Sequence, residues 1–138
     1  MFPEDLFAFV LEQLADEIAS REMPAAKPLN TDSFVARSVL QKAIRRGMAD
    51  LALRAAATLI ATDRRTLWRR LLVTALEDLG VGEVDLLARI VSASRDRVWR
   101  EQVGGEWRVV AHLIEQACAG TRCQTANDLQ PPMSSLCR

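Results

Sequence analysis

The sequence is poor in residues that commonly carry acid–base chemistry, since it has one histidine and no tyrosine. It lacks the Gly-x-x-x-x-Gly-Lys-Ser/Thr loop that holds nucleotide phosphates, and neither of its only lysines, Lys27 and Lys42, follows a glycine. Its five prolines lie near the start or in connecting segments, so none interrupts a helical pattern. No alternating run of β-branched and aromatic residues predicts a strand. These absences favour an all-α fold and a protein that is not an enzyme.

Disulfide and membrane signals are also lacking. The three cysteines, Cys118, Cys123 and Cys137, are odd in number and crowded near the C-terminus, which argues against a disulfide framework and leaves their role open. The N-terminus lacks the basic start of a signal peptide, and acidic residues interrupt its apolar run. No apolar stretch approaches the roughly 20 residues that span a bilayer. We therefore expect a cytoplasmic protein that does not contact a membrane.

The composition is that of one folded domain. Apolar residues make up 49% of the 138 residues and charged residues 26%, a balance typical of a globular chain with a core. We predict a single compact bundle of about six helices over residues 1–128 and a disordered tail over residues 129–138. The first helix, over residues 3–21, precedes a linker over residues 22–31. It packs either on its own core or on a neighbouring chain.

Three consecutive helices are predicted between residues 33 and 80. The first begins near Phe34, and Thr31, Asp32 and Ser33 supply side-chain oxygens that can cap it, while Gly47 ends it in a left-handed conformation. The second, over residues 48–61, is rich in alanine and leucine, so we expect it to be central. Thr62 and Asp63 cap the third, which Gly80 and Gly82 end.

Two more helices are predicted over residues 83–101 and 106–119, with Gly104 and Gly105 as a firm break between them. We expect the second half of residues 83–101 to be largely exposed because it is highly charged. Trp99 and Trp107 flank the break, where they either staple the two helices together or mark a subunit interface.

Charge is spread unevenly along a chain whose net charge is zero. Residues 32–70 carry nine cations and three aspartates, a net charge of +6, whereas residues 1–31 carry two cations and six carboxylates, a net charge of −4. Either the acidic first helix packs beside the basic helices, or both are ordinary solvated faces, or the basic helices over residues 34–70 contact phosphates. The candidates for nucleic-acid contact are Lys42, Arg45, Arg46, Arg65, Arg69 and Arg70.

One further row of polar residues runs along a single helical face. Arg70, Thr74, Glu77 and Asp78 lie at positions i, i+4, i+7 and i+8, which predicts a polar network. Glu77 and Asp78 are adjacent, so they point about 100° apart and do not form a matched acid–base pair.

The histidine and cysteines do not form a recognised site. The spacing of His112, Cys118 and Cys123 is not that of a zinc motif and lacks a fourth ligand. Residues 112 and 118 also point to different sides of a helix, which disfavours a nucleophilic pair. We therefore predict no catalytic, cofactor-binding or metal-binding residue.

A family pattern covers about residues 33–87. The residues that carry it are Ser38, Lys42, Ile44 and Arg45 in the first central helix, Asp50, Ala52, Leu53, Ala56 and Leu59 in the second, and Arg69, Arg70, Leu71, Ala75, Glu77, Asp78 and Gly80 in the third. In this order they resemble the C-terminal helical domain of the RarA/MgsA family of replication-associated AAA+ ATPases. No ATPase core is recognisable beside it. The resemblance implies a helical collar that oligomerises on a DNA-processing machine.

The sequence supports two hypotheses for function. The first is a non-enzymatic helical interaction module, self-associating as a dimer or larger, whose partner belongs to bacterial DNA replication or repair. The alternative is a small nucleic-acid-binding protein that uses the basic helices.

Overall fold

The computed structural model describes the chain over residues 2–79 and 84–129, and its side chains over residues 6–77 and 84–120. The regular elements in these ranges are all helical, so the predicted all-α fold is confirmed. They are α1 (Phe2–Ala19), α2 (Ser33–Arg45), α3 (Ala49–Thr62), α4 (Arg64–Thr74), the π-helical turn η1 (Ala75–Leu79), α5 (Val84–Arg95), α6 (Arg97–Gln102) and α7 (Glu106–Leu129). Among the residues described, no helix is long and apolar enough to cross a membrane.

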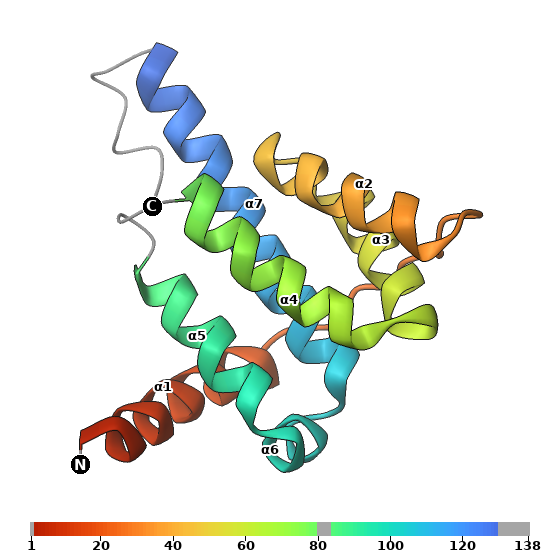
Figure 1. The fold of residues 1–138 in the computed structure, drawn as a ribbon. Helices are drawn as coiled ribbons and strands as arrows, with labels where there is room; N and C mark the ends of the chain where they lie inside the picture. Colours follow the sequence, from red (N-terminus) through yellow and green to blue (C-terminus); the bar gives the residue numbers. More distant parts are fainter. Residues whose placement is uncertain (1, 80–83, 130–138) are drawn as a thin grey trace.

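Helix α7 is the centre of the bundle. It runs behind α4 in Figure 1 and contacts α1, α2, α3, α5 and α6. Its side chains at Val109, Val110, Leu113 and Ile114 are fully buried. One hydrophobic cluster joins these residues to buried side chains of the helices from α1 to α5.

Helix α2 begins and ends where its sequence signals predict. An Asp32 carboxylate oxygen accepts the Val35 backbone N–H at 2.9 Å, which satisfies one of the free amides of the first turn. At the other end, Gly47 has φ of 70°, and its N–H donates to the Ile44 carbonyl while the Met48 N–H donates to Ala43. This pair of bonds closes the helix around a left-handed residue.

Helix α3 is as central as predicted. Ala52, Ala55 and Ala56 are fully buried, and their small side chains let α2 and α7 approach closely. Asp63 caps the start of helix α4, because its carboxylate accepts both the N–H and the hydroxyl of Thr66.

The prediction of one helix over residues 83–101 was wrong, because the chain breaks at Asp96 into α5 and α6. Asp96 accepts the Trp99 N–H at 3.0 Å and so caps a new helix. The Arg100 guanidinium donates to the Ala93 and Ser94 carbonyls and so satisfies the end of α5. This contact buries Arg100, in a segment that we expected to be largely exposed.

Helix α7 extends ten residues beyond the predicted end at Ala119. Residues 120–129 lack the apolar row that marks the earlier turns, so periodicity alone placed the end too early. Residues 130–138, which make up most of the predicted tail, lie outside the described part of the chain.

Helix α1 packs on its own bundle, against α5 and α7. Leu14 and Ile18 are fully buried there. The linker after α1 is fixed by hydrogen bonds, because the Trp107 indole N–H donates to the Pro24 carbonyl and the Leu29 N–H donates to the Thr58 hydroxyl. Trp107 therefore holds the linker.

The conformation of Gly47 yields a stability prediction. Gly47→Ala should lower the free energy of unfolding by about 1 kcal/mol, because a Cβ disfavours positive φ. Gly47→Asn should lose less, since asparagine tolerates this conformation. Urea unfolding of the three proteins measures the difference, and equal stability of the glycine and alanine forms would contradict the assignment.

Candidate functional site

The structure gathers the predicted basic residues on two adjacent helices. Helices α2 and α4 pack against each other, as Figure 1 shows, and the Arg70 guanidinium reaches the Gln41 side-chain oxygen at 3.5 Å between them. We define the basic α2–α4 surface by seven cations of these two helices and the cap of α2, which are Arg37, Lys42, Arg45, Arg46, Arg65, Arg69 and Arg70. Arg64, the remaining cation of α4, is left out because it pairs with Glu106 of α7.

Helical spacing explains why these cations face outwards. In α2 the buried side chains recur at Ala36, Leu40 and Ala43, so Lys42 lies on the opposite, exposed face. In α4 the buried row includes Leu67 and Leu71, which leaves Arg65 and Arg69 exposed one turn apart. Arg70 is half-buried because it lies between the helices.

Much of this positive charge is not neutralised by neighbours. Among the described side chains, no carboxylate oxygen lies within 4 Å of the charged nitrogens of Lys42, Arg65 or Arg69. The nearby Asp63 carboxylate caps α4 by accepting hydrogen bonds from Thr66. The hydrogen bond from the Thr66 hydroxyl lowers the pKa of this carboxyl, and the positive charges of Arg37 and Arg69 lower it further. The surface therefore presents a row of available cations.

An exposed aromatic ring lies at the edge of the surface. Phe34, at the start of α2, is 69% exposed, and the Arg37 guanidinium lies 5.0 Å from its ring centre. An exposed ring beside cations is a common feature of surfaces that bind nucleic acids.

The predicted polar network is not assembled among the described side chains. Arg70 contacts Gln41, Thr74 is fully buried without a hydrogen-bond partner, and Glu77 is exposed. Asp78 lies outside the described side chains. The predicted spacing assumed an α-helix throughout, whereas the wider turn η1 begins at Ala75 and changes the direction of the residues after it.

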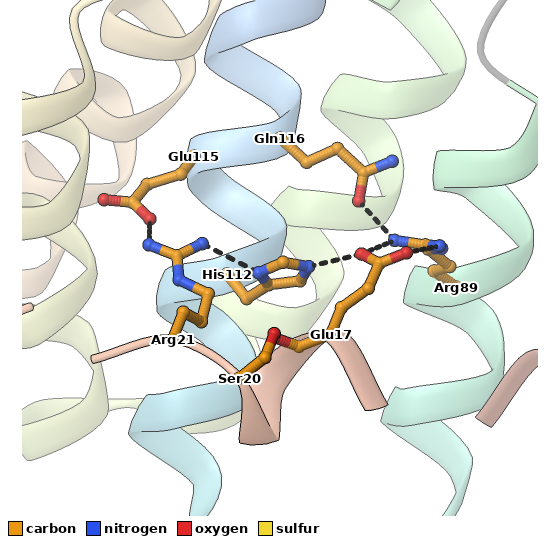
Figure 2. A network of polar contacts seen from close by, with 7 residues as sticks. All are labelled: Glu17, Ser20, Arg21, Arg89, His112, Glu115 and Gln116. Atoms are coloured by element: carbon orange, nitrogen blue, oxygen red, sulfur yellow. Dashed lines mark hydrogen bonds and ion pairs between the residues drawn. The ribbon is translucent and has the colours of Figure 1, made fainter. Parts of the chain in front are cut away.

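A different polar network, which the sequence did not reveal, ties α1 to α5 and α7 (Figure 2). The two terminal guanidinium nitrogens of Arg89, Nη1 and Nη2, donate to the Glu17 carboxylate at 2.7 and 2.6 Å. The Arg21 guanidinium pairs with Glu115 and donates to His112 Nδ1 at 2.8 Å. The partners lie more than 70 residues apart, so no local spacing could have signalled the network.

The geometry fixes the role of each histidine nitrogen. Arginine has only donors, so His112 Nδ1 must accept from Arg21. The neutral ring then carries its proton on Nε2, which donates to Glu17 Oε1 at 2.9 Å. The hydrogen bond from Arg89, helped by that from His112, lowers the pKa of Glu17 from 4.5 to about 2.

The same network explains how the acidic first helix is accommodated. Helix α1 lies against α5 and α7, and its Glu17 is neutralised by Arg89 of α5. In the described part of the chain it makes no extensive contact with α2, α3 or α4. Among the described side chains, Lys42, Arg65 and Arg69 of the basic α2–α4 surface form no ion pair with α1.

The described side chains include His112 and one of the three thiols, Cys118. Cys118 is fully buried in the core, and Cys123 and Cys137 lie outside the described side chains. Among the residues that the structure describes, no three His, Cys, Asp or Glu side chains are grouped to hold a metal ion. Comparisons with protein-family models, curated proteins and solved structures found no match to this chain.

The Glu17 pairing predicts a pH-dependent stability. Its folded pKa is depressed, so the pairing stabilises the protein fully above about pH 4.5 and the gain is lost as the pH falls towards 2. Because the Glu17 side chain is 46% exposed, water screens the pair, and Glu17→Gln should cost only about 1 kcal/mol near neutral pH.

Urea unfolding over a pH series tests this expectation. The stability difference between the wild type and Glu17→Gln should shrink below about pH 4.5. Glu12→Gln, on the same helix and without an ion pair among the described side chains, is the control and should change stability little. A difference that stays constant with pH would show that the Glu17 charge is not stabilised by its partners.

Proposed function

We propose that this chain is a non-enzymatic helical interaction module of the cytoplasm, and that the basic α2–α4 surface is where it contacts its partner. The observation that carries the proposal is the set of exposed cations, Lys42, Arg65 and Arg69, that have no carboxylate partner among the described side chains. Solvated charges of one sign on adjacent helices attract a surface of the opposite sign.

The polar residues elsewhere support a binding role over catalysis. Both ring nitrogens of His112 are engaged in hydrogen bonds, and its neighbours Glu17 and Arg21 are themselves paired. These groups hold α1 to the bundle. A structural role is sufficient to account for their hydrogen bonds.

A role in replication or repair rests on the family resemblance. The resembling region, about residues 33–87, forms α2, α3, α4, η1 and the start of α5. The basic α2–α4 surface therefore lies within the segment that resembles the RarA/MgsA collar. We propose a replication or repair protein as the partner on this basis.

Self-association is part of the same proposal. Size-exclusion chromatography with light scattering should show a dimer or a larger assembly at micromolar concentration. A strict monomer at high micromolar concentration would contradict self-association. It would not bear on binding to a different protein, which needs its own test.

Direct contact with a nucleic-acid backbone is the second candidate. Exposed Phe34 beside Arg37 specifically favours it, because aromatic rings and guanidinium groups interleave on such surfaces. A phosphate backbone would meet both α2 and α4, since the two helices pack together.

The salt dependence of duplex DNA binding tests this candidate. Replacing Arg65 and Arg69 by glutamine should reduce the slope of log K against log salt by about 1–2, because each lost phosphate contact removes a released counterion. Lys27→Gln with Arg97→Gln removes the same charge at exposed positions off the surface and should leave the slope unchanged. Equal slopes for the two double variants would reject the contact.

A further inference from the structure

A groove separates the N-terminal half of α1 from the junction of α5 and α6. Its volume is about 450 Å³, within the range of small-molecule sites. Phe7 and Leu11 of α1 form one wall and Trp99 of α6 the other. The groove lies on different helices from the basic α2–α4 surface, so a ligand bound in it would be independent of the proposed function.

Ser92 lines this groove with an unsatisfied hydroxyl. The residue is 1% exposed, and its oxygen has no hydrogen-bond partner. Ser94, two residues further along α5, instead donates to the Val91 carbonyl at 2.9 Å, as a helical serine commonly does. A buried hydroxyl that has lost its hydrogen bonds to water and has gained none from the protein is energetically unfavourable, so a ligand that bonds to it would gain affinity.

The charges at the rim indicate the sign of that occupant. Glu12 and Asp96 contribute two carboxylates, against the single guanidinium of Arg95. One Asp96 oxygen accepts the Trp99 N–H, whereas Glu12 forms no ion pair among the described side chains. The groove is therefore net negative and favours a cation.

The groove already accommodates one planar cation. The Arg95 guanidinium lies 4.1 Å from the centre of the Phe7 ring, which shows that this aromatic wall accepts such a group. The indole of Trp99, on the other wall, is the better cation–π acceptor of the two ring types.

We propose that this groove is a binding site for a small organic cation in which an amine or amidine is attached to an apolar ring. The ring packs between Leu11 and Trp99. One N–H of the cation pairs with Glu12, and another donates to the Ser92 hydroxyl. The site thus supplies apolar contact, opposite charge and a hydrogen-bond acceptor for one ligand.

Three probes of equal size and different charge test the proposal. Benzamidine, benzamide and benzoate carry charges of +1, 0 and −1 on the same ring, and each is titrated into isotopically labelled full-length protein while amide shifts are monitored. Benzamidine should bind most tightly, with shifts around Ser92, Trp99 and the facing turn of α1. Benzoate should bind most weakly.

Ser92→Ala should weaken benzamidine binding roughly threefold to tenfold, the effect of one lost hydrogen bond. It should not impair folding, because the hydroxyl has no partner to lose. Ser94→Ala is the matched control on the same helix and should bind as the wild type does. Binding of benzoate as tight as that of benzamidine, no shifts at the groove with any probe, or unchanged affinity in Ser92→Ala would each overturn the proposal.

Discussion

The burial of α7 between Val109 and Cys118 is the constraint on which the other helices depend. Seven of these ten side chains are at most 3% exposed, so neighbours must cover the helix on nearly every side. Each large apolar side chain buried in this way contributes about 1.5–3 kcal/mol, which no single surface contact matches. The alanines of α3 allow one close neighbour, and α1, α2, α5 and α6 complete the cover.

The apolar faces of the helices pack against α7, so the charged side chains lie on the outer surfaces. In one of two regions these charges are paired, and in the other they are not. At α1 the carboxylate of Glu17 is held by Arg89 and His112, so acidic charge there stabilises the fold. At α2 and α4 the cations Lys42 and Arg65 form no ion pair with a carboxylate among the described side chains. Charge that contributes little to folding is available for a partner.

Features that depend on neighbouring residues along the chain, such as helix ends, could be predicted from the sequence. Features that depend on contacts between distant residues could not. A cap from residues 31–33, which Asp32 provides, the Gly47 terminus and the exposure of Lys42 result from local chemistry and helical period. The break at Asp96 was missed because α6 is short and is fixed by Arg100 reaching back to α5. The network around His112 joins residues more than 90 positions apart, which no single-sequence pattern encodes. The groove at Ser92 likewise exists only once α1 has packed on α5.

The central claim is that the cations of α2 and α4 are available to bind a partner. The most direct test is to titrate a short DNA duplex into the isotopically labelled protein at low salt and to map the amide shifts. We expect chemical-shift changes concentrated on the exposed faces of α2 and α4, around Lys42 and Arg69, that fade as salt is added. Changes centred on α1 and α5, or changes of equal size on every surface, would contradict the claim.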